Sequence, residues 1–227
     1  MGLFGFGKKH STETQQTQTP VAEPTVAPAA PTGNEVFLDL NKGGLLNLEK
    51  NDFLNLTKTG INLTDIRVAA GWDVNHRGQD YDLDLCAFPM NANGEVLNIV
   101  YYGDKRSHGL QLDKDNLTGE GDGDDENIFV NFNKISPDAQ KVIFAVVIYR
   151  GLSKGQTFGH VKNAFVRMVD QSVRPEKEIC RFNLSEDGGK NTAVKFAEII
   201  RTSEGWTFKA IGEYSEESSI ESLARHL

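Results

Sequence analysis

The sequence predicts a mainly β protein: an antiparallel β-sandwich of two sheets with a few short helices, preceded by a disordered N-terminal tether. From residue 35 onward, short runs of β-branched and aromatic residues alternate with Gly, Asn, Asp and Pro, a pattern typical of short strands joined by turns. The composition, 38% hydrophobic and 25% charged, is that of a globular domain with a sizeable core. The longest apolar run, residues 142–149, is far shorter than the ~20 residues of a membrane helix.

Four segments are expected along the chain. They are an apolar and basic peptide at 1–10, a disordered linker rich in Pro, Ala, Gln and Thr at 11–34, the β-sandwich at 35–214, and a helical tail at 215–227. In the tail, Ser215 is the expected N-cap and Glu216 and Glu217 lie in the first turn. Ile220 and Leu223 would then share one face of the helix.

The first ten residues place Leu3, Phe4 and Phe6 directly before Lys8 and Lys9. Such a peptide could dock on a membrane surface or in a partner's groove, and the alternative is a frayed terminus. The linker would allow it to reach away from the domain.

Strands are expected at residues 36–40, 53–57, 65–72, 82–89, 95–102, 127–132, 142–150, 163–169, 178–184, 193–201 and 206–213. The segment 192–201 is ambiguous, because Ala193, Phe196, Ala197 and Ile200 also fit helical spacing. Trp72 and Trp206 are expected to anchor the core.

The net charge of −8 and the lack of a basic patch beyond Lys8 and Lys9 argue against nucleic acid as a partner. Cys86 and Cys180 show no zinc or redox spacing, which fits buried thiols in a reducing compartment. No apolar region of a secretory signal is present at the start, so the expected location is the cytoplasm.

Residues 113–126 carry seven acidic residues against one lysine, a net charge of −6, whereas the net charge of the whole chain is −8. Glycines 119, 121 and 123 are interleaved with the acids, so the backbone can fold tightly and turn carbonyl oxygens inward. Two carboxylates ~4 Å apart repel by roughly 4 kcal/mol at an effective dielectric of ~20. The loop therefore stays open in water unless a cation closes it; an ordinary solvated acidic turn is the alternative.

A second group of acids follows the period of a β-strand. Asp80, Asp82 and Asp84 occupy every second position and would share one face, while Asp73 ends the preceding strand. A charged solvent-facing strand is the alternative. The full set of candidate ligands is Asp73, Asp80, Asp82, Asp84, Asp115, Asn116, Thr118, Asp122, Asp124, Asp125 and Glu126.

An all-oxygen ligand set without His or Cys suits a hard cation, and a flexible, ligand-rich loop favours Ca²⁺ over Mg²⁺, at one or two ions. The spacing does not fit an EF-hand, because apolar Leu117 falls at a ligand position. A metal-dependent phosphoesterase could use the same carboxylates, but the sequence supplies no phosphate clamp and no catalytic motif.

The segment 115–126 resembles the signature of TerD-type proteins, the bacterial tellurium-resistance and general stress domains. Further matching segments are Leu40–Gly44, Gly71–Asp73, Asp82–Asp84, Ala87–Phe88, Phe158–Gly159, Asn163–Arg167 and Gly205–Ala210. The resemblance covers roughly residues 36–213. It departs from the family at Cys86, where a small residue is usual, at the tethered N-terminus, and after Gly212, where an acidic tail replaces a Gly-rich end.

The resemblance implies a β-sandwich that binds Ca²⁺ through the Asp-x-Asp strand and the acidic loop. Among the candidates it favours Asp73, Asp82, Asp84, Asp115, Asn116, Asp122, Asp124 and Glu126 over Asp80, Thr118 and Asp125. The predicted function is non-enzymatic: a calcium-binding stress-response module in which Ca²⁺ orders the loop for assembly with protein partners, with residues 1–10 as a contact at the inner face of the membrane. A structural sandwich whose acids only confer solubility is the remaining alternative.

Overall fold

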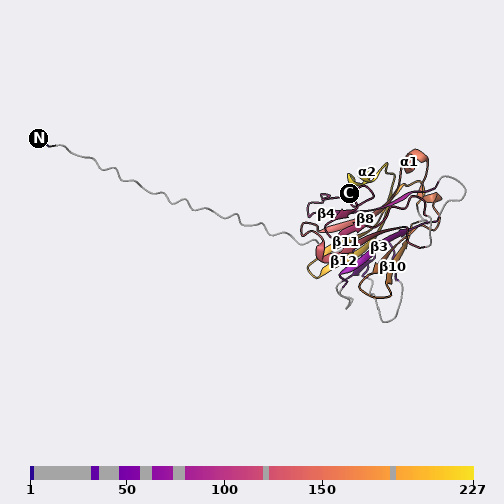
Figure 1. The fold of residues 1–227 in the computed structure, drawn as a ribbon, viewed down its shortest axis with the longest axis horizontal. Helices are drawn as coiled ribbons and strands as arrows, with labels where there is room; N and C mark the ends of the chain where they lie inside the picture. Colours follow the sequence, from indigo (N-terminus) through magenta and orange to yellow (C-terminus); the bar gives the residue numbers. More distant parts are fainter. Residues whose placement is uncertain (3–31, 36–45, 57–62, 74–79, 120–122, 185–187) are drawn as a thin grey trace.

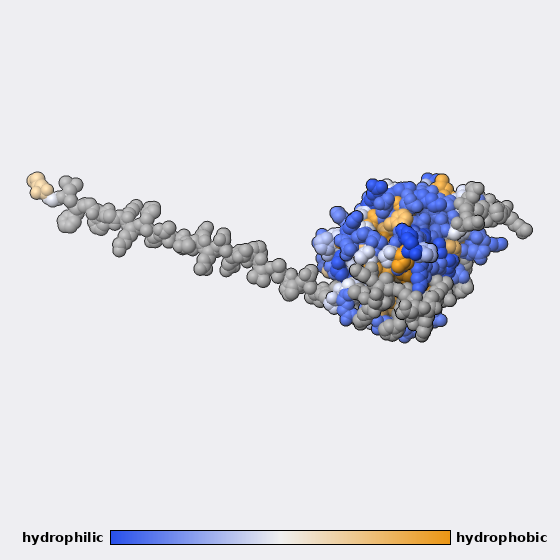
Figure 2. Space-filling view, turned by 60° about the horizontal axis from the view of Figure 1, so that its bottom comes forward, coloured by the Kyte–Doolittle hydropathy of each residue, from blue (hydrophilic) through white to orange (hydrophobic). Residues whose placement is uncertain are grey.

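The computed structural model describes residues 1–2, 32–35, 46–56, 63–73, 80–119, 123–184 and 188–227. The expected N-terminal peptide and linker lie almost entirely outside these ranges, and the expected strand at 36–40 lies wholly outside them. The surface of the folded part is mainly hydrophilic, with small hydrophobic patches between the charged residues (Figure 2). Among the described residues, no helix is long and apolar enough to cross a membrane.

Two sheets pack face to face, which confirms the predicted β-sandwich (Figure 1). The larger sheet has the order β1 (Leu46–Asn47), β10 (Lys177–Asn183), β9 (Phe165–Asp170), β3 (Asp65–Gly71), β7 (Glu126–Asn131), β6 (Leu110–Leu112) and β5 (Arg106–Ser107). The smaller sheet has the order β2 (Phe53–Asn55), β12 (Gly205–Ser215), β11 (Ala193–Thr202), β8 (Lys141–Ile148) and β4 (Leu83–Met90). Apart from the parallel pair β1 and β10, every pairing between these strands is antiparallel.

Side chains of β4 contribute alternately to two hydrophobic clusters, one between the sheets and one on the outer face of the smaller sheet. Leu83 and Leu85 point between the sheets, whereas Cys86 and Phe88 point to the outer face of the smaller sheet. Successive side chains of a strand face opposite sides, so each face acquires its own set of contacts. Asp84 therefore belongs to the outer face.

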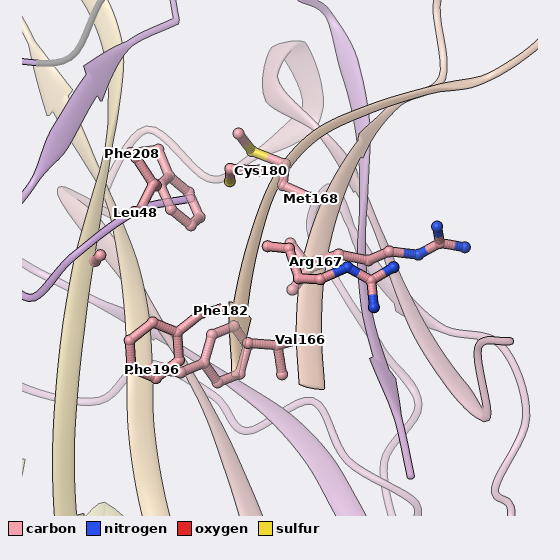
Figure 3. Close-up of a pocket in the computed structure, with 11 residues that line it drawn as sticks. Leu48, Val166, Arg167, Met168, Cys180, Phe182, Phe196 and Phe208 are labelled. Atoms are coloured by element: carbon pink, nitrogen blue, oxygen red, sulfur yellow. The ribbon is translucent and has the colours of Figure 1, made fainter. Parts of the chain in front are cut away.

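The core between the sheets includes Trp72 and Trp206, as predicted, and both cysteines are buried free thiols. A small cavity of about 10 Å³ lies within this core, between the apolar side chains of Leu48, Phe196 and Phe208, while the guanidinium of Arg167 points away from it (Figure 3). Its volume is at the lower limit for one water molecule, and its walls are apolar, so we regard it as a packing defect.

The C-terminal segment differs from the prediction. β12 continues to Ser215, which pairs with Ala193, so the expected N-cap is a strand residue and the helix α2 begins only at Ile220 (Ile220–Ala224). The N-cap is Ser219, whose side chain accepts a hydrogen bond from the backbone N of Ser222. Ile220 and Leu223 do share one face, as expected, and they pack on the outer face of β4 and β8.

Other elements also depart from expectation. Residues 95–102 form no continuous strand, because only isolated bridges join Val96 to Met90, Val100 to Ala87 and Tyr101 to Asp104. The ambiguous segment is the strand β11, as predicted, with a bulge between Lys195 and Ala197. β1, β5 and β6 were not predicted, since two or three residues carry too little alternation to be recognised. The remaining elements are the short helices α1 (Gly151–Lys154), η1 (Phe132–Lys134) and η2 (Phe158–His160).

Candidate metal centre

Three carboxylates from distant parts of the sequence meet at one end of the sandwich. Asp82 immediately precedes β4, Asp84 is the second residue of β4, and Asp115 lies in the acidic segment after β6. One oxygen from each carboxylate lies within 4.8 Å of one oxygen of the other two. The Asp-x-Asp strand and the acidic loop are therefore adjacent in space.

The carboxylates of Asp82 and Asp84 lack the partners that buried polar groups usually have. Asp84 is only 3% exposed, and none of the described residues donates a hydrogen bond to its side chain. Asp82 Oδ1 is buried and also has no hydrogen-bond partner. Burying an unpartnered polar group costs a few kcal/mol or more, so such groups in folded proteins normally have a role.

The electrostatics of the cluster follow from this burial. Desolvation by burial, together with the neighbouring charges of Asp82 and Asp115, raises the pKa of Asp84 from 3.8 to about 8. Burial and Asp115 raise the pKa of Asp82 to about 6. The positive charge of Lys154 opposes both shifts without cancelling them. Without a bound cation, ionising these carboxylates therefore costs free energy, both from desolvation and from their mutual repulsion.

Glu126, the first residue of β7, links the two halves of the centre. It is fully buried; Oε2 accepts a hydrogen bond of 2.7 Å from the backbone N of Leu85, and Oε1 accepts one of 3.1 Å from the backbone N of Asn116. β4 is an edge strand, so the N–H of Leu85 would otherwise lack a partner. Burial, with the charges of Asp84 and Asp115, raises the pKa of Glu126 to about 9 despite these two hydrogen bonds.

Asp125 and Asn116 fasten the acidic segment to the domain. Asp125 Oδ2 accepts a 2.9 Å hydrogen bond from the backbone N of Trp72, and its Oδ1 accepts one of 2.7 Å from Asn116 Nδ2. Asn116 Oδ1 in turn accepts hydrogen bonds from the backbone N of Thr118 and Gly119. These side chains thus shape the loop that presents Asp115.

Two glycines are required by close contacts at this end of the domain. A Cβ on Gly119, which has φ +74, would lie 2.4 Å from Trp72 Nε1. A Cβ on Gly71 would lie 2.4 Å from the carbonyl oxygen of Gly123. Both distances are far below van der Waals contact, so any side chain would displace the acidic loop from Trp72 or from β3.

The carboxylate of Asp124 is bound by two arginines, unlike those of the three clustered acids. Arg167 Nε donates to its Oδ1 at 2.7 Å, and Arg67 Nη1 donates to its Oδ2. Burial opposes ionisation, but the hydrogen bonds from these two arginines outweigh it and lower the pKa of Asp124. The same arginines bind Glu176 and Glu178, so Asp124 belongs to an ion-pair network on the outer face of β3 and β9.

The other predicted ligands lie around the cluster or beyond the described residues. Asp73 is exposed and accepts a 2.6 Å hydrogen bond from Asn163 Nδ2. Asp80 is exposed, and its backbone carbonyl accepts a hydrogen bond from Gln156 Nε2. Asp122 lies outside the described residues.

The residues that adjoin the cluster from the end of β8 and from α1 were not predicted from the sequence. The backbone N of Tyr149 donates a 2.8 Å hydrogen bond to the carbonyl of Asp82, which brings the segment 149–154 beside the acids. The one indication of these residues in the sequence is their position directly after the long apolar strand β8.

Comparison with known proteins finds relatives over most of the described domain. The family model for the TerD domain matches residues 45–227. The Bacillus subtilis (strain 168) protein YceE is 41% identical over 174 residues, covering 74% of this chain and 90% of YceE. The tellurium resistance proteins TerD of Alcaligenes sp and TerX of Serratia marcescens are 36% and 35% identical; the matches cover 74% and 80% of this chain and 89% and 98% of those proteins.

A solved structure supports the fold. The crystal structure of a telluride resistance protein (TerD) homologue from Streptomyces coelicolor A3(2) superposes with a TM-score of 0.60 at 24% identity. The superposition covers 70% of this chain and 95% of that one.

Proposed function

The chain belongs to the TerD family, and from this premise we propose that it is a non-enzymatic, calcium-binding stress-response protein whose ion sits between Asp82, Asp84 and Asp115. The observation that carries the proposal is the meeting of these three carboxylates, of which Asp84 is 3% exposed and Asp82 has a buried Oδ1 with no hydrogen-bond partner. Relatives named as tellurium resistance and stress response proteins support the stress-related role.

The chemistry of the ligand set favours Ca²⁺. Three carboxylates supply between three and six oxygens, and Ca²⁺ accepts six to eight at flexible angles, with water completing the shell. Mg²⁺ demands a tight octahedron and releases its waters reluctantly, which suits a strand-and-loop site less well. One ion at this cluster is the stoichiometry we propose.

Binding would act on the order of the acidic segment. Asp115 is exposed and its loop is held by hydrogen bonds through Asn116, whereas Asp84 is fixed in β4. An ion shared by these two residues would join the loop to the smaller sheet. At a hundred times its dissociation constant, the ion would add ~2.7 kcal/mol to stability.

Asp124 falls outside the proposed ligand set, because its carboxylate is held by two arginines. Glu126 and Asp125 support the site through hydrogen bonds to the backbone and to Asn116. We further propose that the protein acts in the cytoplasm with protein partners, and that residues 1–10 contact the membrane or such a partner.

Isothermal titration calorimetry tests the ion and its site together. We expect one Ca²⁺ per chain, weaker or no binding of Mg²⁺, and loss of Ca²⁺ binding in Asp82→Asn and in Asp84→Asn. Asp138→Asn, which removes an exposed acid outside the cluster, is the matched control and should bind as the parent does. Unchanged Ca²⁺ affinity in both cluster variants would overturn the proposal.

The phosphoesterase alternative finds no particular support in this geometry. If the three carboxylates held a catalytic metal, the protein with Mn²⁺ or Mg²⁺ should hydrolyse p-nitrophenyl phosphate, and Asp84→Asn should abolish the reaction. We expect no turnover by either protein.

A further inference from the structure

A groove of about 220 Å³ adjoins the proposed calcium site and shares Asp84 with it. Its walls come from β4, from the adjacent β8 and the residues just after it, from Tyr102, and from the segment that leads into α2. Its lining residues are Asp84, Tyr102, Val147, Tyr149, Arg150, Ser218, Ser219 and Ile220. Four of these side chains carry hydroxyl groups and one carries a guanidinium, so the groove offers hydrogen-bond donors around a single buried carboxylate.

Two basic side chains lie over the ring of Tyr149 at the groove. Arg150 Cζ and Lys154 Nζ each lie 5.3 Å from the ring centroid of Tyr149, one of the groove's walls. Neither forms an ion pair with a described carboxylate. By contrast, Arg67, Arg167 and Arg181 on the larger sheet are all bound to acids. The charge of Lys154 already acts on Asp82 and Asp84, so Arg150 is the base that is more available to a ligand.

The local charge makes anion binding depend on the cation. Asp82, Asp84, Asp115 and the nearby Glu221 outnumber the two bases, so the cation-free groove repels an anion. A divalent cation would balance these charges and would still need oxygen ligands beyond those of three carboxylates. An incoming anion could supply them while also meeting the guanidinium of Arg150.

On the basis of the calcium site proposed above, we propose that this groove binds a phosphate monoester in a calcium-dependent manner. The phosphate oxygens would complete the coordination of the ion, and the planar fork of Arg150 suits two of them at once. Lys154 would add a second positive charge, and the hydroxyls of Tyr102 and Ser218 would serve as further donors. These side chains would supply the phosphate contacts that the sequence alone did not reveal.

The test uses the full chain and two probes with the same headgroup chemistry. Glycerol 3-phosphate represents a soluble monoester, and vesicles of phosphatidic acid in phosphatidylcholine represent a lipid headgroup, with pure phosphatidylcholine vesicles as the blank. Binding is measured by calorimetry for the first and by co-sedimentation for the second, each with Ca²⁺ and with chelator. Binding of either probe supports the proposal, and the probe that binds identifies the source of the phosphate.

Variants separate this inference from the calcium site itself. Arg150→Gln should weaken phosphate binding at least about tenfold, the usual cost of a lost charge-assisted hydrogen bond, and leave Ca²⁺ affinity unchanged. Arg106→Gln, at an exposed arginine of β5 in the larger sheet, is the matched control and should change neither. Binding that persists in chelator, binding that survives Arg150→Gln, or no binding of either probe would overturn the inference. A chain that binds no Ca²⁺ at all would instead overturn the proposed function.

Discussion

Replacing Asp84 by Asn should stabilise the cation-free protein, and the gain should grow with pH. Asp84 has carboxylate oxygens within 4.8 Å of it from Asp82 and Asp115, and each ionised pair at that distance repels by about 3 kcal/mol at an effective dielectric of ~20. Asn keeps the shape of the side chain and cannot ionise. The substitution therefore removes the repulsion with little loss of packing.

The pH dependence follows from the raised pKa of Asp84, about 8 in the folded protein against 3.8 when unfolded. A carboxyl group with a raised pKa favours the fold while it is protonated, and this contribution is lost as the pH rises from the unfolded value through the folded one. Over that window the free energy of unfolding falls by up to ~1.4 kcal/mol per pH unit. Because Asp82 shares the titration, we expect the advantage of Asp84→Asn to grow by about 2–4 kcal/mol between pH 5 and pH 8.

Urea denaturation in chelator at pH 5 and pH 8 measures this difference, with Asp138→Asn as the control whose advantage should not vary with pH. Adding Ca²⁺ at pH 8 should stabilise the parent and leave Asp84→Asn unchanged. Repulsion at Asp84 is ruled out if Asp84→Asn is less stable than the parent in chelator at pH 8, or if the stabilities of the two proteins follow parallel pH profiles.

Three further substitutions test the parts around the centre. Glu126→Ala leaves the buried backbone N–H of Leu85 and the part-buried one of Asn116 without their acceptor. Chemical denaturation should therefore show a loss of about 2 kcal/mol or more; a loss below ~1 kcal/mol would contradict this role. Asp124→Asn should lower stability by about 1–3 kcal/mol and change Ca²⁺ affinity, measured by calorimetry, less than about threefold, since the ion-pair network rather than the ion uses this carboxylate; loss of Ca²⁺ binding would return Asp124 to the ligand set. Leu223→Ala should cost about 2–5 kcal/mol by thermal or chemical denaturation, because α2 is fixed to the outer face of β4 and β8 by this side chain; a neutral effect would mean that the helix is not part of the cooperative fold.

The sequence was sufficient for the β-sandwich and most of its long strands, because β3, β4 and β8 are mainly apolar segments of seven or eight residues. It could not place the C-terminal helix correctly. Ser215 is an acceptable N-cap by type, but its pairing with Ala193 extends β12 and delays the helix to Ile220. Long-range pairing outweighed a local preference of about 1 kcal/mol.

For the acidic residues, too, the sequence predicted one part of the arrangement and could not predict another. Their sequence spacing identified Asp82, Asp84 and Asp115 as ligand candidates, but not which acids would be occupied by other partners. Asp124 differs from its neighbours only because Arg67 and Arg167, from strands distant in the sequence, reach its carboxylate. Pairings of this kind depend on the register of β3 and β9, which no local pattern encodes.

Thermal unfolding of the full chain at pH 7, with Ca²⁺ and with chelator, tests the central claim most directly. A cation that binds the folded protein between Asp82, Asp84 and Asp115 must raise the midpoint, and a gain of ~2.7 kcal/mol at a hundred times the dissociation constant corresponds to a shift of several degrees. We expect that shift for the parent and for Asp138→Asn, and no shift for Asp84→Asn. Equal midpoints for the parent in Ca²⁺ and in chelator would contradict it.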